Sequence, residues 1–130
     1  MSALFEVSEK YELLALHRAL FEAKHHADPD DTAIVGSPYV AALSLRVVDA
    51  LAELDDPPTF GPGWREWQRA EKHEHRLPLV RSRIEECSPW SKWDADQKRE
   101  YVRILLAPLV AEATTLADLV AHGDHHHRAV

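Results

Sequence analysis

Two histidines and a glutamate are the residues of this chain whose positions favour metal chemistry. His17 falls within the apolar stripe of one expected helix, and His73, with Glu74 beside it, falls within the stripe of another. Facing helices of a bundle can direct such side chains at a common interior, where imidazole and carboxylate groups bind zinc or iron. One hypothesis is therefore a site made by His17, His73 and Glu74, with His25 or His122 as further ligands.

The spacing of these residues indicates a metal site less strongly than the motifs of bundle proteins that hold a metal centre. Such proteins use paired motifs on facing helices, for example a glutamate three residues before a histidine. Glu22 and His25 have this spacing, but Glu22 lies on the polar side of its helix and no matching motif accompanies it. The alternative interpretation of His17 is a core histidine with one hydrogen bond.

The four tryptophans form two pairs with identical spacing, Trp64 with Trp67 and Trp90 with Trp93. An indole offers a large apolar surface and one N–H group that needs a partner when it is buried. We expect the two pairs to anchor the ends of one helix and to present a surface to a ligand or a protein partner. A pocket walled by tryptophan could also hold a small apolar ligand.

No catalytic motif stands out in the sequence. A nucleophilic cysteine needs a nearby histidine that lowers its pKa, and the single Cys87, at the end of an apolar stripe, favours a structural thiol instead. The chain has no glycine-rich phosphate loop, no G-x-S-x-G motif and no alternation of strands with helices. Catalytic residues therefore stay unknown, and the sequence does not decide whether the protein is an enzyme.

The elements that position these residues are expected to be helical. Apolar residues recur with a spacing of three and four, which predicts four helices near residues 8–27, 38–55, 63–87 and 91–122. Ser37 followed by Pro38 is a strong helix start. We therefore predict an all-α, up-and-down four-helix bundle. Because proline lacks the N–H group that a helix needs, we expect kinks at Pro78 and Pro108.

The later helices carry more detailed predictions. The stripe of the third helix places His73 in the core, whereas His75 falls on the surface. Asp94 followed by Gln97 has the form of a capping box, in which the two residues hydrogen-bond reciprocally at a helix start. Gly123 resembles the glycine that ends many helices.

Length and charge limit the class of protein. A chain of 130 residues suits one domain, and we expect residues 1–122 to form it and 123–130 to be a polar, histidine-rich tail. The net charge of -7, with 22 acidic against 15 basic residues, argues against nucleic acid as a partner. No apolar run reaches the ~18 residues of a membrane span, and the first residues lack a secretory signal. We therefore expect a cytoplasmic protein without a membrane partner.

The second expected helix is apolar over much of its surface, which favours burial in a partner. Our leading hypothesis is a small acidic interaction or regulatory protein without catalytic activity or cofactor, which forms a homodimer or binds another protein. The alternative is a metal-binding bundle, or a small metal-dependent enzyme, that uses its core histidines with zinc or iron. A third hypothesis is a binder of small apolar ligands.

Overall fold

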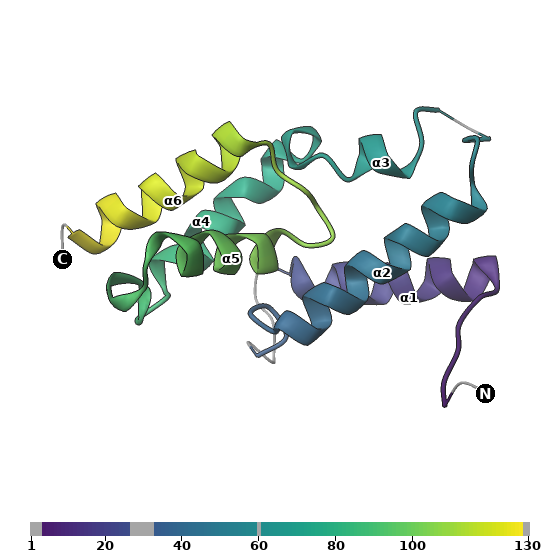
Figure 1. Cartoon of the computed structure of the whole chain (residues 1–130), viewed down its shortest axis with the longest axis horizontal. Coiled ribbons are helices and arrows are strands. Elements are labelled where there is room, and N and C mark those ends of the chain that lie inside the picture. Colours follow the sequence, from purple (N-terminus) through teal and green to yellow (C-terminus); the bar gives the residue numbers. More distant parts are fainter. Residues whose placement is uncertain (1–3, 27–32, 60, 129–130) are drawn as a thin grey trace.

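The computed structural model describes residues 4–26, 33–59 and 61–128, and this part of the chain is all-α (Figure 1). Six α-helices and three 3-10 helices (η) follow one another within it, in the order α1 (Lys10–Lys24), α2 (Pro38–Leu54), α3 (Trp64–Trp67), η1 (Ala70–Lys72), η2 (Glu74–Arg76), α4 (Leu77–Glu85), η3 (Trp90–Lys92), α5 (Ala95–Leu106) and α6 (Ala113–Arg128). None of these helices is long and apolar enough to cross a membrane.

The helices gather in two groups, with α1 against α2 at one end of the molecule and α4, α5 and α6 at the other (Figure 1). Each group has its own cluster of buried apolar side chains, one around Leu13, Val47 and Leu51 and a larger one around Ile84 and Trp90. The prediction of an all-α protein is confirmed. A four-helix bundle is not confirmed, because the described chain contains five long helices instead of four.

Two predicted helix starts are confirmed. The Ser37 side chain accepts a hydrogen bond from the Val40 amide at 3.2 Å, so it caps α2 as expected. At the start of α5, the Asp94 side chain accepts from the Gln97 amide at 2.9 Å, and the Gln97 side chain accepts from the Asp94 amide at 3.0 Å. Both ends depend on local sequence, which explains why they were predictable.

The predicted third helix over residues 63–87 is wrong, because α3, η1, η2 and α4 divide this stretch. The Gln68 carbonyl accepts from the Val110 amide at 2.7 Å, and the Ala70 amide donates to the Val110 carbonyl at 2.9 Å. These bonds take both groups out of the helical pattern. Pro78 lies in the first turn of α4, where its missing N–H group costs nothing, so it begins a helix and does not kink one.

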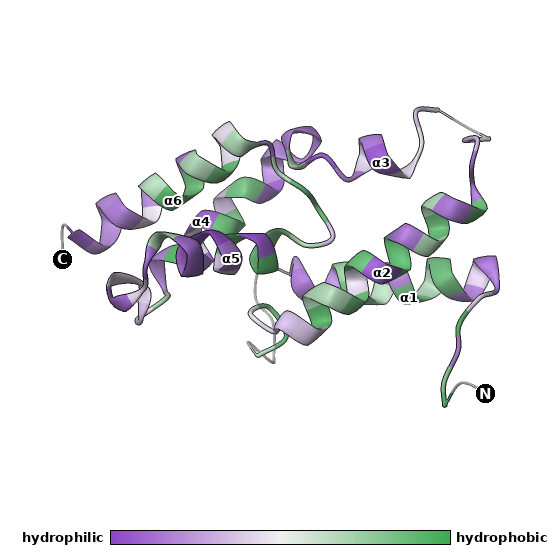
Figure 2. Ribbon diagram, viewed as in Figure 1, coloured by the Kyte–Doolittle hydropathy of each residue, from purple (hydrophilic) through white to green (hydrophobic). Residues whose placement is uncertain are grey.

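The predicted fourth helix over residues 91–122 is also wrong, since it consists of two separate helices. The first, α5, ends at Leu106, and the second, α6, begins at Ala113. Between them the Ala107–Pro108 peptide bond is cis. Figure 2 shows that this connection is hydrophobic, and its first three residues are buried.

Two side chains at the end of α1 donate hydrogen bonds to carbonyl groups that the break between α5 and α6 leaves without a helical partner. Pro108 has no N–H group for the Ile104 carbonyl, and Lys24 Nζ donates to that carbonyl instead. His25 Nε2 donates to the Ala107 carbonyl at 3.4 Å. Both side chains are buried, and the ammonium group of Lys24 suits the negative end of the α5 dipole. These bonds join the two groups of helices.

The last helix continues through Gly123 to Arg128, so the predicted helix end near residue 122 is wrong; residues 129–130 lie outside the described part. An ideal Cβ on Gly123 would lie 2.4 Å from Trp90 Cζ2 and 2.6 Å from Ile84 Cγ2. Both neighbours are fully buried. Glycine is therefore required here for close packing and not for helix termination.

Acid is expected to weaken the join between α1 and α5. Burial, and after it the charge of Lys24, lowers the pKa of His25 from 6.5 to about 4. Between these values the unfolded chain binds a proton that the folded protein does not, so the free energy of unfolding falls as the pH falls from 6.5 towards 4. In His25→Gln the glutamine amide can still donate to Ala107. Denaturant titrations of this variant should show a loss of unfolding free energy over the same pH range that is smaller than in the wild type by about 1–3 kcal/mol.

His75→Gln is the matched control for this substitution, because His75 is exposed. We expect it to keep the pH dependence of the wild type. Identical pH dependence in the wild type and in His25→Gln would contradict a buried, neutral His25.

Gly123→Ala is expected to destabilise the protein. The added methyl group overlaps Trp90 and Ile84, and overpacking of this kind costs about 1–3 kcal/mol, more than alanine gains in helix propensity. The midpoint of thermal unfolding should fall. The control is Gly36→Ala, whose Cβ would lie an ordinary 3.8 Å from Tyr101 Cε1. Equal midpoints of thermal unfolding for the two variants would argue against the packing of α6 on Trp90.

Candidate functional site

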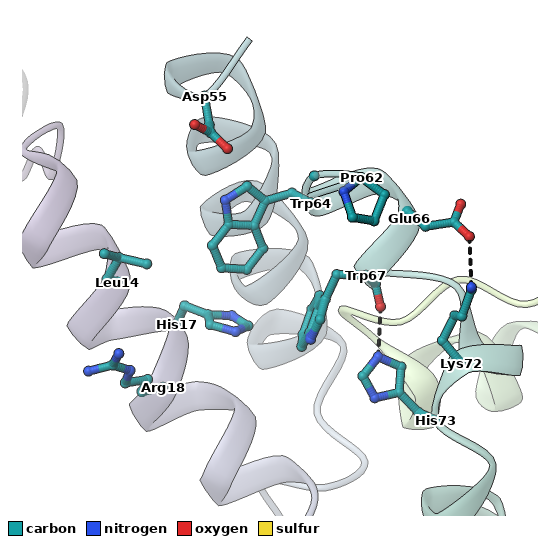
Figure 3. Close-up of a pocket in the computed structure, with 11 residues that line it drawn as sticks. Leu14, His17, Arg18, Asp55, Pro62, Trp64, Glu66, Trp67, Lys72 and His73 are labelled. Atoms are coloured by element: carbon teal, nitrogen blue, oxygen red, sulfur yellow. Dashed lines mark hydrogen bonds and ion pairs between the residues drawn. The ribbon is translucent and has the colours of Figure 1, made fainter. Parts of the chain in front are cut away.

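A pocket of about 610 Å³ opens between α1 and the chain that runs from the end of α2 through α3 to η1 (Figure 3). Small-molecule sites commonly enclose roughly 300–1,000 Å³, so the pocket has a suitable size. Its lining mixes apolar, aromatic and charged side chains from these elements, namely Leu14, His17, Arg18, Asp55, Pro62, Gly63, Trp64, Glu66, Trp67, Lys72 and His73.

A sharp turn before α3 directs the first tryptophan pair into this pocket. Gly63 has φ 88°, a conformation that only glycine adopts readily, and a Cβ there would lie 2.7 Å from Pro58 Cγ. The turn leads directly into the single helical turn of α3. Trp64 and Trp67 are three residues apart and therefore lie on the same face of that turn.

Three rings form a corner of the pocket, which we call the aromatic corner (His17, Trp64 and Trp67). The His17 ring lies 5.1 Å from Trp64 and 4.9 Å from Trp67 between centroids, at interplanar angles of 83° and 80°. The two indoles are 5.6 Å apart at 74°. The three ring planes are thus nearly perpendicular to one another. Both indoles are partly exposed and offer apolar surface to a ligand.

His17 supplies the polar group of this corner. Its side chain is only 8% exposed, and its ring makes no hydrogen bond with any residue that the structure describes. Burial, and after it the charge of Arg18, lowers the pKa of His17 below 6.5. The ring is therefore neutral at neutral pH, with one nitrogen that donates and one that accepts.

His73 lies on the other side of Trp67 and is buried, as predicted, whereas His75 is exposed. His73 Nε2 lies 2.6 Å from the Trp67 carbonyl. A carbonyl only accepts, so Nε2 carries the hydrogen and donates it. The ring also contacts the Trp67 indole, with 5.1 Å between centroids. His73 therefore holds the end of α3 and the Trp67 ring in position.

The three predicted metal ligands do not meet at one point. The Trp67 indole lies between His17 and His73 (Figure 3), and Glu74 is exposed and outside the pocket lining. Within segments 4–26, 33–59 and 61–128, no three histidine, cysteine or acidic side chains are grouped so that they could hold a metal ion. Metal binding by these residues stays a prediction.

The other candidate residues from the sequence lie away from the pocket. His25 is bonded to Ala107, and His122 Nε2 lies 2.6 Å from Glu85 Oε2. Cys87 is buried, and burial raises the pKa of its thiol. Each of these groups thus has a place in the packing of the helices.

The second tryptophan pair is not part of this site. Trp90 has no exposed surface, and its Nε1 group donates to Asp124 Oδ1 at 3.0 Å. Trp93 is half-buried and packs against Tyr101, with 5.2 Å between ring centroids. The prediction of a ligand or partner surface is therefore wrong for Trp90, which instead attaches α6 to the start of α5.

Arg18 and Leu14 line the pocket but were not predicted from the sequence. Both lie within four residues of His17 on α1, so helical spacing places all three on adjacent parts of one surface. That spacing was visible in the sequence. The wall of the pocket opposite α1 could not be predicted from the sequence, because its position depends on where α3 ends.

No protein-family model matches this chain, and no curated protein and no solved structure is significantly similar to it. The functional argument therefore rests on the pocket and its aromatic corner.

Proposed function

We propose that this chain is a small-molecule-binding protein whose pocket takes a planar, largely apolar ligand. The observation that carries the proposal is the aromatic corner, where two partly exposed indoles adjoin a buried imidazole that has no hydrogen bond within the described chain. Indole surfaces favour contact with other aromatic rings. A ligand in the corner would cover apolar area and give His17 a hydrogen-bond partner.

Energetics support binding at this site. Removing apolar area from water contributes about 25 cal/mol per Å², and the partly exposed indoles of Trp64 and Trp67 have apolar area that a ligand can cover. His17 lines the pocket and has no hydrogen bond within the described chain, so a ligand that enters the pocket can bond to its ring. Ligand-binding sites commonly combine apolar walls with a few polar groups in this way.

A set of naphthalene-sized aromatic compounds, neutral and anionic, is expected to include ligands of this pocket. Heteronuclear NMR can follow the indole N–H signals of the four tryptophans, assigned through Trp→Phe variants. Ligands should shift the signals of Trp64 and Trp67 but not that of Trp90, which is fully buried and bonded to Asp124. Leu14→Arg, which places a long charged side chain in the pocket lining, should abolish these shifts.

The matched control is Leu43→Arg, the same exchange at an exposed position of α2 outside the pocket. It should leave the ligand-induced shifts unchanged. If no compound shifts the Trp64 and Trp67 signals, or if Leu14→Arg and Leu43→Arg behave alike, the pocket is not the binding site.

Self-association is a second candidate function, favoured by exposed apolar side chains near one face of α2. Tyr39 and Leu43 are four residues apart on that helix and are 84% and 39% exposed. Phe5 is 84% exposed and adjoins Leu43 along a groove of about 330 Å³. Such surfaces often mark an interface, so a second copy of the chain is a suitable partner.

Sedimentation velocity over a range of concentrations should show a dimer for the wild type. Leu43→Arg should weaken that dimer by about tenfold or more, because it buries an unpaired charge in the interface. Leu14→Arg should leave it intact. A wild type that stays monomeric throughout the range would refute self-association without affecting the ligand proposal.

A further inference from the structure

We infer that the ligand of the pocket is a planar aromatic carboxylate, with its rings in the aromatic corner and its carboxylate between Arg18 and His17. This inference rests on the proposed function and names the chemical class of the ligand. It follows from which polar groups of the pocket are already bonded within the protein and which are not.

The two acidic side chains of the pocket already accept hydrogen bonds. Glu66 Oε1 lies 3.2 Å from Lys72 Nζ and 3.0 Å from Arg69 Nη1. Asp55 Oδ1 accepts from the Thr59 amide at 3.3 Å and from its hydroxyl at 3.0 Å. The charge of Glu66 is therefore paired with two cations and Lys72 is paired as well, whereas Asp55 is bonded only to neutral groups and keeps its negative charge.

Arg18 differs from the other charged groups of the lining. It is exposed and forms no ion pair or hydrogen bond with the residues that the structure describes. In Figure 3 Arg18 lies apart from Asp55, and its side chain points away from the His17 ring. The exposed Arg18 side chain must therefore turn to another rotamer to meet a carboxylate beside His17. A guanidinium group presents paired N–H donors that match the two oxygens of a carboxylate.

His17 provides a second donor in the pocket lining. It is only 8% exposed, lines the pocket and has no hydrogen bond within the described chain. Its ring is neighboured by Arg18 in sequence and by both indoles in space. An anionic oxygen beside His17 can accept from the imidazole N–H and from an Arg18 side chain turned towards it, while the aromatic rings of the ligand meet Trp64 and Trp67.

The test compares 2-naphthoate with 2-naphthamide, which has the same rings but no charge, by calorimetric titration of the full chain at low ionic strength. We expect 2-naphthoate to bind about tenfold more tightly, because hydrogen bonds to a charged group are stronger than those between neutral groups. In Arg18→Gln this preference should disappear, while the affinity for 2-naphthamide changes little. Using the ratio of the two affinities within one variant removes any general effect of the substitution on folding.

Arg46→Gln is the charge-matched control, since Arg46 is exposed on α2 and outside this pocket; it should keep the tenfold preference. Equal affinities of the wild type for both compounds, or an unchanged preference in Arg18→Gln, would overturn the carboxylate inference and leave the binding proposal standing. Failure of both compounds to bind, together with unshifted Trp64 and Trp67 signals, would overturn the binding proposal itself.

Discussion

Carbonyl groups at interrupted helix ends are the constraint on which this structure depends. The last carbonyls of a helix have no N–H partner within it, and a buried polar group without a partner costs about 1–3 kcal/mol. Basic side chains donate to such carbonyls here: Lys24 to Ile104, His25 to Ala107 and His73 to Trp67. Each bond satisfies a helix end and fixes the position of a second element.

The pocket exists because α3 stops after one turn. In a continuing helix the Trp67 carbonyl would accept from the amide of residue 71, and no ring would be needed to satisfy it. Instead, the pairing of Gln68 with Val110 ends the helix, and His73 Nε2 donates to the Trp67 carbonyl. The chain folds back around Trp67, so its indole faces His17 on α1. The same helix end thus accounts for the local fold and for the aromatic corner.

Local patterns in the sequence predicted a substantial part of this arrangement. The α2 cap at Ser37 and the buried position of His73 follow from spacing and side-chain chemistry over a few residues. The pairing of Gln68 with Val110 joins distant residues, and periodicity along one helix carries no information about it. Gly123 shows the same limit, because its small size is needed by Trp90, a residue that sequence spacing does not place beside it.

Burial explains why chemically identical histidines have different roles. An imidazole kept neutral by burial has one donor nitrogen and one acceptor nitrogen, and the lowered pKa values of His17 and His25 favour this state at neutral pH. His25 uses its donor on the Ala107 carbonyl, as His73 does on Trp67. His17 has indole rings beside it instead of a free carbonyl. Its donor therefore stays available for a ligand, which makes His17 the residue where the packing of the helices and the proposed binding function meet.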